Sequence, residues 1–293
     1  MRRRSYMEIS SMIVFLSIIS ILVQFAAYYF IASPYLVLGI SSVIVIISTH
    51  ILLEQSLTYE SCTVYSILLL FISIIITFLT YLGTDANLLP FTNTLFGIIV
   101  VNWFIPMAHC FIRNMFDYGS RIEKFNSFYR NVSIVFLLFY IGALLYLSFS
   151  DSPITSIYHT RSGKYNFTPF WWVATLIEDY INDMIPFSDV IVYLISRILT
   201  YIPYGFYSVL ILRDRSKLVR LLLLLLLPSI IELAQYFIIP SRCDIDDVIY
   251  AFIGGAIGGL WYHIINHIYH AISGRDFLTK DSDYRYSNST LLF

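Results

Sequence analysis

Eight stretches of about twenty consecutive apolar residues run through this chain, and each is long enough to cross a bilayer as a helix. Their apolar residues are continuous and do not alternate with polar ones, which argues against a membrane β-barrel. Only 13% of the 293 residues are charged and 58% are hydrophobic, so a soluble domain would lack polar surface. The sequence predicts an all-α polytopic membrane protein with spans at about 11–32, 35–53, 64–83, 91–112, 131–150, 188–212, 217–239 and 247–270.

Lys and Arg are distributed unevenly among the segments that join these spans. With the amino terminus in the cytoplasm, 14 of the 18 basic residues fall in cytoplasmic segments, and the outer loops hold only Arg161, Lys164 and Arg242. The positive-inside rule describes this excess, so we expect both termini to lie in the cytoplasm. The start, MRRRSYMEIS, has no small-residue cleavage site and is interpreted as a retained signal anchor.

Two charged residues lie inside predicted spans. Glu232 is about eight residues from the outer end of the seventh span, and Arg197 lies at nearly the same depth in the sixth. Charges in hydrocarbon cost about 2.5–3.5 kcal/mol each on insertion scales, so they usually pair or line a wet cavity. Because the two spans are consecutive and antiparallel, we predict that Arg197 and Glu232 face each other, directly or through one water. A protonated, hydrogen-bonded Glu232 is the alternative.

Further polar residues share the helix of Glu232. Ser229, Glu232 and Gln235 follow at intervals of three residues, which predicts one wall of an outward-facing polar pocket. Hydrogen bonding between neighbouring helices is the alternative explanation for such residues.

Charged residues also gather just before the last span. Arg242, together with Arg197, is predicted to bind phosphate or carboxylate. Asp244 and Asp247 would orient Arg242, hold a divalent ion, or do both. Capping of the last helix is the alternative for these two acids, and it applies above all to Asp247.

Two features predict packing and placement in the membrane. The glycines of the last span form overlapping GxxxG patterns, which we interpret as close packing inside the chain rather than dimerisation. Residues 169–182 have helical apolar spacing beside Trp171 and Trp172, which favours a short helix at the headgroup level.

Apart from the divalent ion considered for Asp244 and Asp247, the sequence predicts no metal site, no cofactor and no nucleic-acid partner. Its three cysteines are far apart and form no CxxC. His263 and His267 are one helical turn apart, but spacing fixes no third ligand. A clustered basic groove for nucleic acid is absent from the sequence.

Five short motifs follow one another after residue 165: N-x-x-P-F, P-x-G, S-x-x-E-x-x-Q, a variant of R-x-x-D-x-x-D, and a glycine-rich helix. Their residues are Asn166, Pro169, Phe170, Pro203, Tyr204, Gly205, Ser229, Glu232, Gln235, Arg242, Asp244, Asp247, Gly254 and Gly258. This ordered set resembles the VanZ-like family, which is named for a teicoplanin-resistance protein. Arg197 and Ala251 stand where the family tends to have asparagine, which implies a changed ligand or a degenerate site.

The resemblance implies a four-helix VanZ-like membrane domain at about 131–272. A four-span region of no recognised family would precede it at 1–130, and a polar cytoplasmic tail would follow at 273–293. Binding roles fall to Asn166, Arg197, Glu232, Gln235, Arg242, Asp244 and Asp247, and structural roles to Pro169, Pro203, Gly205, Gly254 and Gly258.

Family members are associated with tolerance of lipoglycopeptide antibiotics, and the family offers no established catalytic residues. The resemblance therefore implies a non-enzymatic protein of the bacterial plasma membrane that binds a cell-envelope component, a lipid-linked precursor or the glycopeptide itself. Its other expected partners are membrane lipids and a membrane protein bound through residues 1–130.

Three alternatives stay open. An intramembrane enzyme acting on a phospholipid would use Glu232 as general acid or base and Mg²⁺ at Asp244 and Asp247. The sequence has no nucleophile motif to support it. A transporter or flippase would fit the span number, although no inverted repeat is visible. An accessory subunit of a membrane complex would suit the four extra spans.

Overall fold

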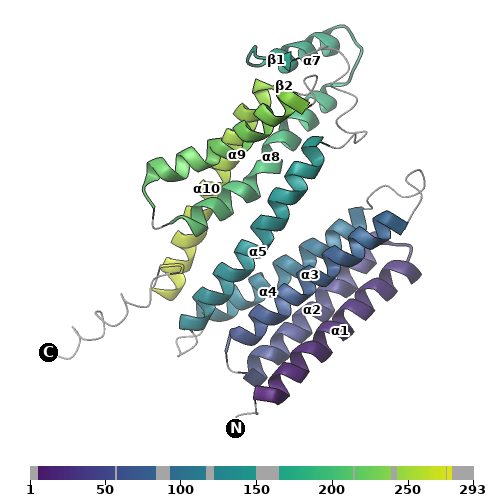
Figure 1. Ribbon diagram of the computed structural model, residues 1–293, viewed down its shortest axis with the longest axis vertical. Coiled ribbons are helices and arrows are strands. Elements are labelled where there is room, and N and C mark those ends of the chain that lie inside the picture. Colours follow the sequence, from purple (N-terminus) through teal and green to yellow (C-terminus); the bar gives the residue numbers. More distant parts are fainter. Residues whose placement is uncertain are drawn as a thin grey trace, which may run out of the picture. The chain divides into compact units, whose positions relative to one another are not determined.

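The computed structural model describes residues 6–56, 58–83, 93–116, 122–149, 165–213, 215–238, 243–274 and 276–278. It is 89% helical, with nine helices among these residues (Figure 1). Eight are long and apolar enough to cross a membrane, which confirms the predicted fold class. They are α1 (Tyr6–Phe30), α2 (Pro34–Ser56), α3 (Glu60–Gly83), α4 (Asn93–Phe116), α5 (Ile122–Phe149), α8 (Phe187–Ile211), α9 (Lys217–Ile238) and α10 (Ile245–Ser273).

The chain forms two compact units. The first comprises Met1–Phe136 with Ile268–Phe293, and the second comprises Leu137–His267. In the first unit, α1 to α4 pack together, and their mostly apolar interior includes several buried polar side chains. Gln24 and Asn102 are fully buried and exchange amide hydrogen bonds of 2.6 and 3.1 Å between α1 and α4. Hydrogen bonds between buried polar side chains hold membrane helices together where hydrophobic burial contributes little.

In the second unit, glycines allow α8 and α10 to pack backbone to backbone. A Cβ at Gly205 would collide with the backbone of Gly255, and one at Gly258 would collide with the backbone around Ile202. A Cβ at Gly254 would likewise collide with the carbonyl oxygen of Ile198. The GxxxG glycines of α10 therefore pack against a helix of the same chain.

Hydrogen bonds to main-chain carbonyls connect the other helices of the second unit. Tyr204, next to the helix-internal Pro203, donates to the carbonyl of Leu223 and joins α8 to α9. Tyr140 donates to the carbonyl of Thr200 at 2.6 Å and joins α5 to α8.

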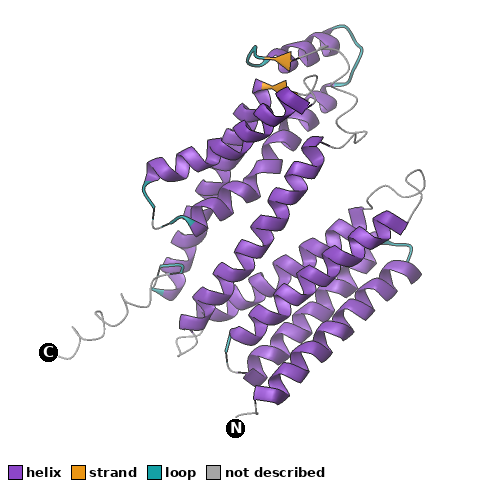
Figure 2. Cartoon of the chain, viewed as in Figure 1, coloured by secondary structure: helices purple, strands orange, loops and turns teal. Residues whose placement is uncertain are grey.

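One end of the second unit carries the short helix α7 (Trp171–Ile181) and two short strands, β1 (Tyr165–Asn166) and β2 (Cys243–Asp244) (Figure 2). The predicted helix near 169–182 is therefore present. It is anchored by buried Trp172 and Leu176, which pack against Val190 and Tyr193 of α8 and Tyr250 of α10. These contacts fix α7 beside the start of α10.

Candidate functional site

The strand pair brings two sequence-predicted site residues together. β1 and β2 are parallel, and Asn166 lies opposite Asp244 in their register. The Asn166 Nδ2 atom donates a 3.0 Å hydrogen bond to Oδ1 of Asp244, and Asn166 Oδ1 accepts the N–H of Thr168. Asn166 is thus held at both ends of its amide, one end on the turn before α7 and the other on Asp244.

Asp244 is the residue that caps α10. Its Oδ1 atom accepts the backbone N–H of Asp246 at 3.0 Å, which is the usual pattern of an aspartate just before a helix. The alternative prediction that Asp247 caps this helix is wrong, because α10 begins at Ile245 and Asp247 already lies in its first turn. The Asp244 N–H in turn donates to Oε2 of Glu232 at 2.7 Å.

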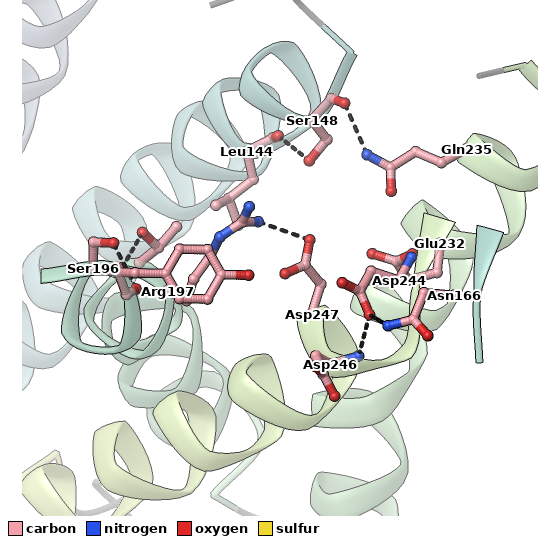
Figure 3. Close-up of polar contacts among 12 residues, drawn as sticks. Leu144, Ser148, Asn166, Ser196, Arg197, Glu232, Gln235, Asp244, Asp246 and Asp247 are labelled. Atoms are coloured by element: carbon pink, nitrogen blue, oxygen red, sulfur yellow. Dashed lines mark hydrogen bonds and ion pairs between the residues drawn. The ribbon is translucent and has the colours of Figure 1, made fainter. Parts of the chain in front are cut away.

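Arg197 pairs with Asp247. Its Nη1 atom lies 2.7 Å from Asp247 Oδ2 (Figure 3). The guanidinium carbon lies 5.4 Å from the centroid of the Tyr193 ring, over its face. The predicted Arg197–Glu232 pair is therefore wrong in its partner. Glu232 is engaged by the backbone of Asp244, whereas the first turn of α10 carries Asp247 towards α8.

Gln235 lies one turn along α9 from Glu232 and is 5% exposed. Its Nε2 atom donates to the carbonyl of Ser148 on α5 at 2.8 Å, and its Oε1 atom is buried without a hydrogen-bond partner. Ser229 is exposed, so the predicted three-residue stripe holds only for Glu232 and Gln235. Each residue turns about 100° around the axis of a helix. Six residues separate Ser229 from Gln235, so their side chains point about 120° apart and do not share one face.

Asp246 is a residue that the sequence analysis did not single out as a site residue. It is fully buried, and its Oδ1 atom accepts the backbone N–H of Phe170, immediately before α7. Phe170 has a φ of 60°, a left-handed conformation that is unfavourable for a bulky side chain. A carboxylate at the amino end of α7 also suits the helix dipole. The three acidic residues within 244–247 were the sequence signal that could have identified Asp246 as a site residue.

Burial changes the acidity of the residues just outside α10. It raises the pKa of Asp244 to about 7, and the carboxylate of Asp247 adds to this effect. The N–H of Asp246 and the amide of Asn166 oppose it by stabilising the ionised form. Burial also raises the pKa of the neighbouring Cys243 thiol to about 11.

The structure thus gathers most of the predicted binding residues at one end of the second unit. Arg242 lies outside the described residues. Ala251 is buried in α10, and Pro169 lies in the turn before α7. We call the gathered set the polar cluster, which consists of Asn166, Arg197, Glu232, Gln235, Asp244 and Asp247.

Metal ligands do not converge in the part of the chain that the structure describes. No three His, Cys, Asp or Glu side chains there are placed to hold an ion together. His50 and His109 of the first unit contact each other edge to face, with ring centroids 5.7 Å apart.

Apolar spanning helices around a cluster of charged and amide side chains define a polytopic membrane protein with a polar site. Residues 134–266 match the model of the VanZ/LLP1 family, a little under half of the chain. This segment contains the whole polar cluster, and it is similar to the VanZ/LLP1 family. The resemblance read from the motifs is confirmed. Searches of curated proteins and of solved structures found no match.

Proposed function

We propose that the VanZ-like domain binds a cell-envelope component, such as a lipid-linked precursor, at the polar cluster, and that this binding confers tolerance of teicoplanin. The observation that carries the proposal is the connection from Glu232 through Asp244 to Asn166, which ties a glutamate of an apolar helix to the strand pair. Ionisable residues within membrane helices are costly and commonly serve a ligand or an ion path.

The distribution of Lys and Arg supports an outward-facing cluster. In this orientation the cluster lies at the surface where glycopeptides act and where lipid-linked envelope precursors are used. The proposal places the protein in a bacterial plasma membrane.

The hydrogen bonds of the cluster favour binding over catalysis. Asp244 Oδ1 accepts two donors, from Asn166 and from Asp246, and Glu232 Oε2 accepts a third from the backbone. Carboxylates held by several fixed donors keep one geometry, which suits the positioning of a bound group.

Susceptibility to teicoplanin, with vancomycin beside it, tests the proposal in a susceptible Gram-positive host. Strains would express the wild-type chain, Glu232→Gln or Asp247→Asn at matched membrane levels. We expect the wild type to raise the inhibitory concentration of teicoplanin and each variant to lose that protection, because each removes a charge from the cluster.

Glu60→Gln is the matched control, since it makes the same chemical change in the exposed pair between Glu60 and Lys124 of the first unit. It should protect as the wild type does. Equal susceptibility of cells with and without the wild-type protein would refute the link to teicoplanin. Full protection by both cluster variants would refute the role of the cluster.

A further inference from the structure

The buried side-chain atoms of the polar cluster that lack a hydrogen-bond partner within the described chain are all acceptors. Asn166 Nδ2, Gln235 Nε2 and Arg197 Nη1 each donate to a protein oxygen. Gln235 Oε1 and Asp247 Oδ1 are buried and accept no hydrogen bond within the described chain. What the cluster lacks is therefore a group that donates.

Gln235 gives the clearest indication of where that group would lie. Its amide orientation is fixed, because only the NH₂ group can bond the carbonyl of Ser148. The Oε1 atom consequently points towards the space between Glu232 and Asp247 (Figure 3). A buried amide oxygen without a partner is unusual in a folded protein and marks a site that a ligand or water would complete.

The charges of the cluster point to a cation. Arg197 balances Asp247, which leaves Glu232 without a cationic partner among the described residues. The Arg197 and Asp247 side chains remain 25% and 15% exposed, so a small group can reach them. A phosphate would meet these carboxylates at close range. A neutral hydroxyl would satisfy the oxygens but leave the negative charge.

As a deepening of the proposed function, we infer that the polar cluster holds the primary ammonium group of a lipid headgroup between Gln235 Oε1, Asp247 Oδ1 and the Glu232 carboxylate. A primary ammonium carries three N–H donors and one positive charge, as the lysine side chain does, which matches these three acceptors and the unbalanced carboxylate. A metal ion fits less well, since no three acidic, His or Cys ligands converge among the described residues.

Thermal unfolding of the purified full-length chain in detergent micelles tests the inference. The probes are dihexanoyl phosphatidylethanolamine, phosphatidylcholine and phosphatidylglycerol at equal concentrations, and free ethanolamine. A ligand that binds only the folded state raises Tm with its concentration. We expect phosphatidylethanolamine to raise Tm. The choline lipid, whose cation has no N–H, and the glycerol lipid, which has no cation, should raise it far less.

Two variants locate the effect. The Glu232→Gln protein should need about tenfold more phosphatidylethanolamine than the wild type, or more, for the same rise in Tm. This is the expected effect of weakening a charge-assisted hydrogen bond. Glu60→Gln should respond as the wild type does. If Glu232→Gln does not fold, the comparison of headgroups on the wild-type chain decides by itself.

The remaining outcomes overturn the inference. If phosphatidylglycerol raises Tm as much as phosphatidylethanolamine does, the ammonium assignment is wrong, but the proposed envelope-binding function stands. If free ethanolamine raises Tm equally, the bound group need not belong to a lipid, and the assignment to a lipid headgroup is wrong. No rise with any probe removes the assignment as well, and the teicoplanin assay then judges the proposed function separately.

Discussion

The backbone N–H of Asp244 donates a 2.7 Å hydrogen bond to the carboxylate of Glu232, twelve positions earlier in the chain. This bond joins β2 to the interior of α9. Asp244 Oδ1 in turn accepts hydrogen bonds from Asn166 and from the N–H of Asp246 in the first turn of α10. The acid of the spanning helix and the cap of the next helix therefore act as one structural group.

The Arg197–Asp247 pair should contribute to stability as a partly buried ion pair. We expect a double-mutant cycle of Arg197→Ala and Asp247→Ala to give a coupling energy of about 1–3 kcal/mol, because each single change leaves a charge poorly compensated. The Arg113–Glu54 pair, with exposures of 43% and 38%, should give less than about 1 kcal/mol in the same measurement. Equal coupling in the two cycles would contradict this assignment.

Asp244 should make stability depend on pH. Its folded pKa of about 7 lies above its ordinary value, so the folded state binds the proton more tightly than the unfolded state. The associated stability is complete below about pH 4 and is lost as pH rises through 7, by at most about 1.4 kcal/mol per pH unit. Asp244→Asn keeps an oxygen acceptor and removes the titration.

The measurement is Tm between pH 4.5 and 8 for the wild type and Asp244→Asn. The variant should gain stability relative to the wild type as pH rises. Two curves that stay parallel over this range would show that Asp244 does not titrate there.

Gly205→Ala should destabilise the second unit strongly. The added methyl group meets the backbone of Gly255, which cannot move aside as a side chain can. We expect a loss of about 2 kcal/mol or more, seen as a lower Tm or as loss of folded protein. Gly142→Ala on α5 is the control, since nothing lies within 4 Å of its new Cβ, and it should be neutral or slightly stabilising. Similar behaviour of the two variants would contradict the close contact of α8 and α10.

Asp246→Ala should loosen α7 from α10. The change removes the acceptor of the Phe170 N–H, which helps to hold that residue in its left-handed conformation. The fluorescence of Trp171 and Trp172, which contact each other on α7, should then shift. Asp189→Ala, in the first turn of α8, removes a partly exposed acid and should leave the emission unchanged. An unchanged spectrum for Asp246→Ala would argue against this anchor.

The sequence predicted the spans because apolar length is a strong and local signal. It also placed Arg197 and Glu232 at similar depth. It could not assign their partners, because partners depend on how each helix is rotated about its axis. That rotation follows from contacts such as Gly205 against Gly255, which no periodicity reveals.

The strand pair escaped prediction, and the capping alternative favoured Asp247 over Asp244, for related reasons. Two-residue strands leave no alternating pattern, so nothing in the sequence linked Asn166 to Asp244. The choice of Asp244 over Asp247 as cap depended on whether α10 starts at 245 or 247. Helix ends are less certain from sequence than the helices themselves.

The bond between Asn166 and Asp244 spans 78 positions, and α7, α8 and α9 all lie between its ends. During synthesis, residue 166 emerges long before residue 244 exists. Until then the amide of Asn166 and the carboxylate of Glu232 lack the partner they share in the finished fold. A chain truncated before β2 would lack α10 as well, so α8 would lose the helix packed against its glycine, and Asn166 and Glu232 would both lose Asp244.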